Sequence, residues 1–322
     1  GEAEVLFTNA TRVMKATAIG EKSYKPAEEN ATYVFFGLQE NLIRLQIEFE
    51  ANVTPRAVTL KQGIFTFQTD KRYESHASSL LNLFSTVYDN FTGLFNVTLD
   101  MVRIQFFIPD FEALLSVGGY VPFTGENLGD IHINIFFMRG VNGTLEVIAL
   151  HELVHHFLWK AGLSPDRFLW FHEGMAQYMS TEVAGGLGYK GAFFEKDALG
   201  NGTLQLIERG GENFEFLQYW KPGFEPADIT ACYTASHYVI SRMAEKYGGL
   251  DYYSRFFELV NGARVESNDV LAYYLSRAAE TSVAPDLKRW GFKIVDLYTN
   301  LSSVDEAGRT VTALNQMCVC LL

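Results

Sequence analysis

Two histidines and a glutamate in the middle of the chain constrain its fold more than any other feature. Residues 151–155 read His-Glu-Leu-Val-His, and seventeen residues separate His155 from Glu173. On a helix, residues four apart lie on one face, so His151 and His155 would be close enough to hold one metal ion. Glu152 would then stand beside the metal, where a carboxylate can act as a general base. The alternative is a pair of histidines that are satisfied by hydrogen bonds on a half-buried helix.

The residues after this motif indicate how a third ligand would reach the metal. Gly162 can adopt the left-handed conformation that ends a helix, and Ser164 followed by Pro165 is typical of the start of the next one. From His155 to the turn the first helix descends about 9 Å, and from Pro165 to Glu173 the second climbs back about 12 Å. The two antiparallel helices therefore bring Glu173 level with the histidines. Zinc that catalyses hydrolysis has three protein ligands and one open position, and this set supplies the three.

Two further segments carry a family pattern. Segment 170–178 reads Trp-Phe-His-Glu-Gly-Met-Ala-Gln-Tyr, which is similar to a W-x-x-E-G-x-A-x-Y signature. Together with the first motif it resembles the gluzincin zinc metallopeptidases of the peptidase MA-like group. Segments 233–240 and 245–248 resemble the next helix of that family. By this resemblance Tyr233 aligns with the tyrosine that donates a hydrogen bond to the tetrahedral intermediate in gluzincin aminopeptidases. The resemblance covers residues 60–300.

The chain also departs from that pattern. The residue four after the third ligand is acidic in many relatives and orients a ligating histidine, whereas here it is Gln177, whose carbonyl can still accept a hydrogen bond. The G-x-M-E-N segment by which gluzincin aminopeptidases hold a free N-terminus is not found before the motif, which favours internal cleavage. We interpret His156 and His172 as groups that support or flank the ligands. A closed structural zinc site with one of them as the fourth ligand is the alternative.

The resemblance implies a zinc-dependent peptidase that acts on a peptide or protein substrate. We expect zinc on the three ligands to polarise the scissile carbonyl and to activate a water molecule, with Glu152 as the general base. Tyr233, or His237 one turn further on, would stabilise the oxyanion. The expected activity is that of an endopeptidase. The alternative is an extracellular binding module that keeps the zincin fold and a structural zinc ion but has no turnover.

Composition and sequons predict where the protein works. The net charge of −12 argues against nucleic-acid binding, and no apolar run reaches the eighteen or so residues of a membrane helix. Half of the sixteen asparagines begin an N-x-S/T sequon, where composition predicts about two sequons. These are Asn9, Asn30, Asn52, Asn90, Asn96, Asn142, Asn201 and Asn300. We therefore expect a glycosylated protein that is extracellular or at the cell surface, either secreted or held by a membrane anchor outside the given sequence.

The order of the patterns predicts an α+β fold: a zincin-like catalytic domain with a small twisted mixed sheet, an active-site helix and a C-terminal helical lobe. We expect residues 1–58 to form an N-terminal helical or mixed extension, as a spacer rather than a pro-segment. The peptidase domain would cover residues 59–300, with the sheet part over 59–160 and the helical lobe over 161–300. Residues 301–322 would form a tail.

Periodicity predicts the individual elements before the metal motif. A stripe of apolar residues predicts a helix over residues 26–49, although its last residues also alternate like a strand. A longer helix is predicted over 74–95, and strands are predicted near 58–69, 102–108 and 131–137. By the resemblance, the last of these would be the sheet edge that pairs with an extended substrate.

Overall fold

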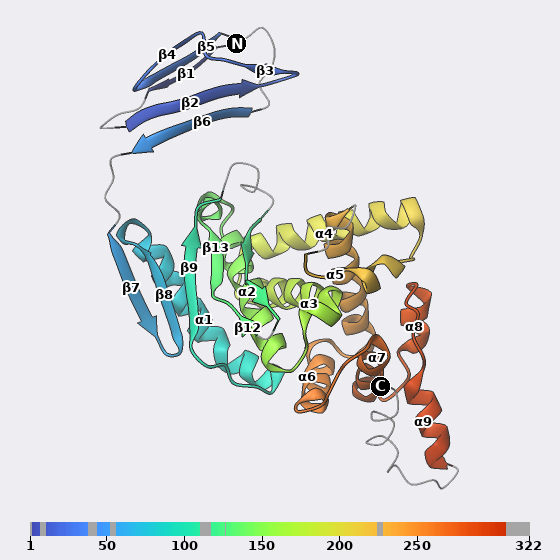
Figure 1. Cartoon of the computed structure of the whole chain (residues 1–322). Helices are drawn as coiled ribbons and strands as arrows, with labels where there is room; N and C mark the ends of the chain where they lie inside the picture. The colour runs from blue at the N-terminus through green and yellow to red at the C-terminus, as the bar shows by residue number, and fades with distance from the viewer. Residues whose placement is uncertain are drawn as a thin grey trace.

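The computed structural model describes seven stretches of the chain: residues 2–6, 11–37, 44–51, 56–109, 117–125, 127–223 and 228–306. Two hydrophobic cores organise these residues. A small core lies within the strands that precede residue 52, and a large one is shared by the sheet and helices that follow residue 56. Figure 1 shows the N-terminal strands as a layered unit of their own.

The N-terminal part is built of strands. They are β1 (Glu2–Leu6), β2 (Thr11–Ile19), β3 (Ser23–Tyr24), β4 (Glu28–Asn30), β5 (Tyr33–Gly37) and β6 (Arg44–Ala51). They form two antiparallel three-stranded sheets, ordered β1-β5-β4 and β3-β2-β6. The core between them contains Ala16, Ala18, Val34 and Phe36.

The prediction of a helix over residues 26–49 is therefore wrong. Along β5, buried Val34 and Phe36 alternate with less buried neighbours, which is the period of a strand. A turn precedes β5, in which the side-chain carbonyl of Asn30 accepts a hydrogen bond from the backbone N–H of Thr32 (2.9 Å). The range holds β4, β5 and most of β6, and the apolar spacing across these strands coincides with that of a helix.

A five-stranded sheet supports the metal motif. Its order is β10-β13-β9-β8-β7, with β8, β9 and β13 parallel to one another and the two outer strands antiparallel. The strands are β7 (Ala57–Gln62), β8 (Phe65–Asp70), β9 (Val102–Phe107), β10 (Gly119–Tyr120) and β13 (Ile131–Asn134). The single strand predicted near 58–69 is thus a hairpin of two strands. The strand predicted over 102–108 is β9.

The predicted substrate edge is also corrected. β13 covers only the first part of the range 131–137, which continues as the 3-10 helix η2 (Ile135–Arg139). It lies between β9 and β10, so the edge of the sheet beside it is β10. A two-residue strand has no periodicity to recognise in a sequence, which explains the error. Between β10 and β13 the chain forms a small separate hairpin of β11 (Phe123–Thr124) and β12 (Asn127–Leu128).

Helices α1 (Glu74–Phe95) and α2 (Thr144–Lys160) pack against this sheet and against each other. α1 follows the 3-10 helix η1 (Lys71–Tyr73) and has the bounds that the sequence predicts, with one buried stripe of leucine, valine and phenylalanine side chains. α2 carries the two histidines of the metal motif. Nine of its residues are buried, so the helix is fixed in the core on several sides.

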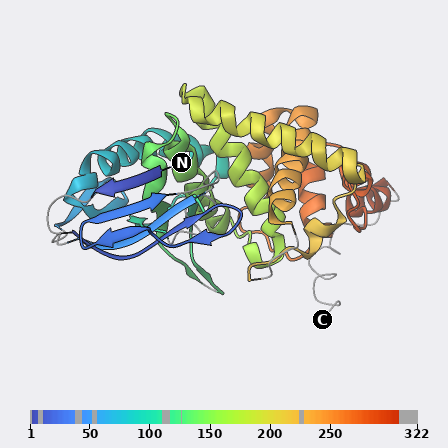
Figure 2. The ribbon, with the colours of Figure 1, turned by 90° about the horizontal axis from the view of Figure 1, so that it is seen from above.

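The rest of the chain is helical, as Figure 2 shows from above. It contains α3 (Pro165–Gly186), α4 (Lys190–Gly210), η3 (Glu215–Tyr219), α5 (Ile229–Tyr247), α6 (Gly249–Val260), α7 (Asn268–Ala279), α8 (Ala284–Arg289) and α9 (Leu297–Glu306). α3 is central and packs against α2, α4 and α5. The first residues of the predicted tail 301–322 belong to α9, and residues 307–322 lie outside the described residues. Within the described part of the chain, no helix has both the length and the apolar character to cross a membrane.

Candidate metal centre

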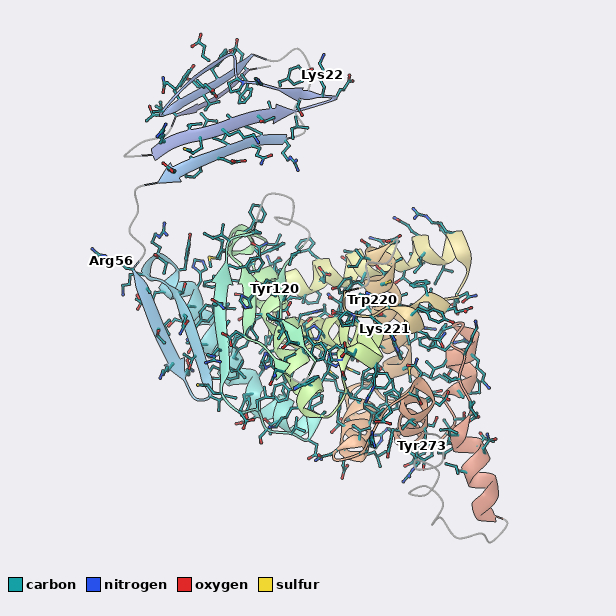
Figure 3. All side chains as sticks on the ribbon, viewed as in Figure 1. Lys22, Arg56, Tyr120, Trp220, Lys221 and Tyr273 are labelled. Atoms are coloured by element: carbon teal, nitrogen blue, oxygen red, sulfur yellow. The ribbon has the colours of Figure 1, made fainter. Side chains whose placement is uncertain are left out.

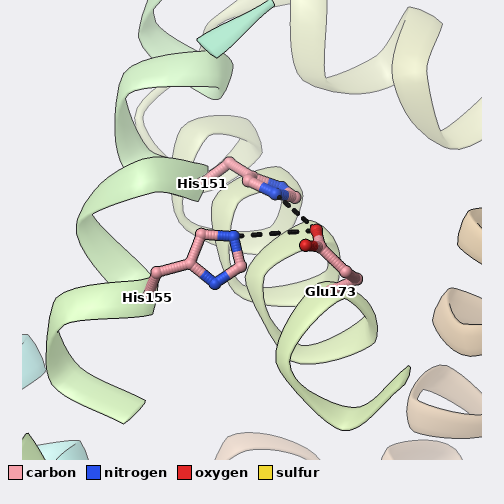
Figure 4. Close-up of side chains that lie close together, drawn as sticks. All are labelled: His151, His155 and Glu173. Atoms are coloured by element: carbon pink, nitrogen blue, oxygen red, sulfur yellow. Dashed lines mark hydrogen bonds and ion pairs between the residues drawn. The ribbon is translucent and has the colours of Figure 1, made fainter. Parts of the chain in front are cut away.

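Three possible metal ligands meet where α2 faces α3 (Figure 4). His151 Nε2 lies 3.1 Å from Glu173 Oε2, and His155 Nε2 lies 3.6 Å from the same oxygen. One ligand atom from each residue lies within 4.8 Å of the others. The side chains are 12 to 13% exposed, so each is held by packing but still reaches a cavity. This group could bind a metal ion.

The turn between the two helices uses the residues that the sequence predicts, with one irregularity in α3. α2 ends at Lys160, Gly162 has a φ of 83°, and α3 begins with Pro165 after Ser164. Ser164 has extended backbone angles but makes no side-chain capping hydrogen bond. Phe168 departs from helical geometry (φ −136°), so the first turn of α3 is separated from the remainder by a kink. The antiparallel return still brings Glu173 opposite the histidines.

Gly174, next to the third ligand, allows a close contact between helices. A Cβ atom at this position would lie 2.6 Å from the backbone oxygen of Ser236 and 2.8 Å from Ile240 Cγ1. Only a hydrogen atom fits there, so α5 packs directly behind α3. This contact explains the glycine of the Glu-Gly pair, and it places the N-terminal half of α5, which contains Tyr233, beside the ligands.

A chain of hydrogen bonds fixes which nitrogen of His155 is available. His172 Nε2 lies 2.8 Å from the backbone oxygen of Leu163, and His172 Nδ1 lies 3.3 Å from His155 Nδ1. A carbonyl only accepts, so the proton of neutral His172 is on Nε2 and its Nδ1 must accept from His155 Nδ1–H. His155 Nε2 then keeps a free lone pair, which is the state that a metal ligand needs.

His172 is therefore fully engaged, because both of its nitrogens have partners. It is buried, and its burial lowers the pKa to about 4, so it stays neutral. This arrangement argues against His172 as a fourth ligand. The sequence alone left two roles open for it, a group that supports or flanks the site and a fourth ligand of a closed zinc site. His156, which the sequence analysis grouped with His172, is also kept neutral by burial, which lowers its pKa to about 4.

The electrostatics of the site favour a bound cation. Burial disfavours the charged form of His151, but the hydrogen bond to Glu173 and the charge of Glu152 raise its pKa overall. Burial, assisted by the nearby charge of Glu173, raises the pKa of Glu152 to about 8. Burial and the charge of His151 hold the pKa of His155 well below its usual value. Two carboxylates and two imidazoles around one point fit a divalent cation. Its positive charge would take the place of the protons that the raised pKa values of His151 and Glu152 retain.

A carboxylate that the sequence analysis missed lies behind the site. Glu195 on α4 accepts a hydrogen bond from Gln177 Nε2 (3.0 Å) and is close enough to His151 to raise its pKa. Burial in turn raises the pKa of Glu195 itself. The partner of Gln177 is thus an acidic side chain from another helix. No sequence signal could have revealed it, because α4 meets α3 only in the folded chain.

Glu152 is buried against the edge strand. It is 4% exposed, and a Cβ atom at Gly119 would lie 2.8 Å from its Oε1 and 2.9 Å from the backbone oxygen of His132. Gly119 therefore gives the carboxylate the room to stand between α2 and β10. The proposed general base, Glu152, thus lies directly against the edge strand β10.

A cavity of about 300 Å³ lies in front of the three possible ligands. Its wall includes the three ligand residues together with Glu152 and Tyr233. Tyr233 packs its ring edge-on to Trp220 at 5.1 Å, and the charge of Glu173, then burial, raises its pKa so that it keeps its proton. In Figure 3, Tyr120 lies on the side of the sheet and Trp220 on the side of the helical lobe.

The structure places His237 differently. Its Nε2 lies 3.2 Å from Ser241 Oγ on the same helix, and burial lowers its pKa to about 4. It is not among the described residues that line the cavity around the ligands. The geometry therefore favours Tyr233 over His237 for any contact with a substrate there.

Comparison with known proteins gives a likeness of fold. No protein-family model and no curated protein sequence matches the chain. Native leukotriene A4 hydrolase from yeast superposes with a TM-score of 0.51 at 14% identity, over 90% of this chain and 46% of that one. The same yeast enzyme in complex with bestatin gives 0.47 at 15% identity, over 90% and 45% of the two chains. Another structure of native leukotriene A4 hydrolase, from Saccharomyces cerevisiae, gives a TM-score of 0.46 at 11% identity. That match covers 90% of this chain and 60% of that one.

The chain thus spans about half the length of the first two of these structures. At this identity the likeness concerns the fold alone. The fold is α+β and zincin-like: a small mixed sheet, the helix that carries the two histidines, and a helical lobe that supplies the glutamate.

Proposed function

We propose that the protein is a zinc-dependent peptidase. The observation that carries the proposal is the convergence of His151, His155 and Glu173 on one point, with Glu152 beside them and a cavity in front. Three protein ligands and an accessible fourth side are the arrangement of catalytic rather than structural zinc. The likeness in fold to a yeast hydrolase shows that this scaffold can carry a hydrolase site, and the site residues themselves carry the proposal.

The residues present fit zinc in type, and the hydrogen bonds of His155 leave its Nε2 free to bind. His151 Nε2, His155 Nε2 and a Glu173 oxygen would hold the ion, since two imidazoles and a carboxylate are common zinc ligands. When bound, zinc would supply a Lewis acid that polarises a carbonyl group and lowers the pKa of a water molecule.

The chemistry of proton transfer would then fall to Glu152 and Tyr233. Glu152 would take a proton from the attacking water and deliver it to the leaving amine, because it is buried beside the ligands. Tyr233 would donate its hydroxyl hydrogen to the oxygen on which negative charge develops. The raised pKa of Tyr233 supports this role, since the group remains a donor across the range in which peptidases work.

We further propose internal cleavage. An enzyme that removes terminal residues needs a charged partner for the free terminus. Among the described residues that line the cavity, Glu152 and Glu173 are the carboxylates, and both already have roles in the proposal. Peptides with blocked ends should therefore be cleaved at least as well as free ones, and mass spectrometry of the products would show it. Cleavage of free-ended peptides alone would contradict this proposal.

The Glu152→Gln variant tests the peptidase proposal. The amide keeps the shape of the side chain but cannot accept a proton, so we expect one zinc ion per chain and a loss of at least about 100-fold in kcat. Activity would be measured on a pool of blocked fluorogenic peptides before and after chelation, with re-addition of zinc as the control.

Two outcomes would contradict the proposal. Hydrolysis that survives both the chelator and the substitution would exclude the mechanism. Wild-type protein that binds one zinc ion per chain but cleaves nothing in the pool would instead favour the binding module.

A further inference from the structure

The hairpin β11–β12 presents an apolar pair to the cavity. Phe123 lies opposite Leu128 in the antiparallel ladder, so their side chains are neighbours on one face, and both line the cavity. The second pair, Thr124 and Asn127, is polar and exposed. The hairpin is therefore two-faced, with its apolar face directed at the proposed reaction site.

This hairpin is fixed to the helix that carries the histidines. The ring of Phe123 packs edge-on to Trp159, with a centroid distance of 5.0 Å, and Trp159 lies one turn after His155 on α2. At its base, the backbone N–H of Gly129 donates to the backbone oxygen of Pro122 (2.8 Å). The apolar pair thus keeps a set distance from the ligands.

Other parts of the cavity wall are apolar as well. They include Pro165 and Leu169 from the start of α3, and Pro222 from the segment before α5. Among the described lining residues, the acidic side chains are those of Glu152 and Glu173, and there is no lysine or arginine. The two charges of a zinc ion would balance these two carboxylates. No net charge would remain to compensate an ionised substrate side chain, and burying an unpaired charge is costly.

The size of the cavity limits what it can hold. Its volume of about 300 Å³ is at the lower end of the range of ligand pockets. The peptide group under attack takes part of this space. What remains fits one large side chain rather than an extended stretch of substrate.

We propose that Phe123 and Leu128, with Leu169 from the same cavity wall, form a subsite for a single large apolar side chain next to the cleaved bond. The substrates would be peptides with leucine, methionine or phenylalanine at that position. This inference rests on the proposed peptidase function and adds a selectivity that the metal site itself does not provide.

Turnover provides the first test. The full chain with zinc would be given blocked peptides that differ at one position beside a common cleavage site. A leucine or phenylalanine peptide should have a kcat/KM at least about tenfold above its alanine, lysine and aspartate counterparts, since apolar pockets discriminate by such factors. Equal rates for apolar and charged side chains would overturn the subsite while leaving the peptidase function intact.

A binding measurement separates the subsite from turnover. N-blocked leucine hydroxamate and glycine hydroxamate share the zinc-binding group and differ only in the side chain. Calorimetry on the zinc-loaded chain should show the leucine compound binding at least about tenfold more tightly, even if no peptide is cleaved. Equal affinities would overturn the inference.

Two neighbouring substitutions supply the matched control. Leu128→Asp places a charge on the cavity face, and Asn127→Asp places the same charge on the exposed face. Leu128→Asp should abolish the tenfold preference while keeping one zinc ion per chain. Asn127→Asp should keep both. The subsite would be refuted if the two variants behaved alike.

Discussion

At the scale of single residues, the site depends on groups that never touch the metal. His172 Nδ1 accepts a hydrogen bond from His155 Nδ1–H, and His172 Nε2–H donates to the backbone oxygen of Leu163. Glu195, held by Gln177, places a carboxylate near His151. His155 therefore has a hydrogen-bonded partner on α3, whereas His151 has the charge of Glu195 on α4 nearby. A hydrogen-bonded partner such as His172 fixes the tautomer and orientation of a possible ligand.

The His172→Phe variant tests this support. Phenylalanine fills the buried space but offers no acceptor to His155 Nδ1–H, so we expect the Kd for zinc to rise about 10- to 100-fold. Competition with a chromophoric chelator would measure it. His156→Phe is the matched control. His156 is a neighbouring half-buried histidine that makes no hydrogen bond to Glu173 or His155, so the zinc affinity of this variant should match wild type. Unchanged zinc binding by His172→Phe would contradict the role given to this residue.

At the scale of elements, the site depends on how closely α5 approaches α3. The contact is made at Gly174, where a side chain would meet the backbone of Ser236. Because the obstacle is backbone rather than a flexible side chain, the helices themselves would have to move apart. This links the stability of the lobe to the position of Tyr233 in the cavity.

We expect Gly174→Ala to lower the free energy of unfolding by about 1–3 kcal/mol, as overpacking of a core does. It should also reduce activity, because α5 carries Tyr233. Gly186→Ala at the other end of α3 is the control: its added Cβ meets nothing within 4 Å, and helix propensity predicts a gain of about 0.5–1 kcal/mol. Urea unfolding of both variants would measure the difference. Equal stabilities would show that the close contact does not matter.

Element prediction from the sequence succeeded where a long segment had one strong period. α1 was predicted with its bounds because its buried stripe runs over six turns, and the α2–α3 hairpin followed from the residues of its turn. It failed where short strands dominate. Residues 26–49 contain a helical stripe by spacing alone, and β10 is too short to show any period. The convergence of His151, His155 and Glu173 was predictable because helix geometry relates these residues locally, whereas Glu195 and Gly119 reach the site through long-range packing.

At the scale of the whole molecule, the described N-x-S/T sequons lie on the surface. The described sequon asparagines are all exposed, on the N-terminal strands, on helices and at helix ends. They are Asn30, Asn90, Asn96, Asn142, Asn201 and Asn300. Asn9 and Asn52 lie outside the described residues. None of the six lines the cavity around the metal ligands.

We propose that these sequons carry N-linked glycans, which agrees with the expected extracellular or cell-surface location. Expression through a eukaryotic secretory pathway should give protein whose mass falls on treatment with an N-glycosidase. Asparagine-to-glutamine variants at Asn90 and Asn201 should each remove one glycan. A mass equal to that of the bare chain would contradict the proposal.

The central claim is that one zinc ion is held by two histidines and a glutamate with its remaining side open to the cavity. Anomalous diffraction at the zinc edge, on crystals grown with zinc, tests it most directly. We predict one peak about 2.0–2.2 Å from His151 Nε2, His155 Nε2 and a Glu173 oxygen, with only solvent on the fourth side. A peak elsewhere, Glu173 turned away from it, or a fourth protein ligand would contradict the account.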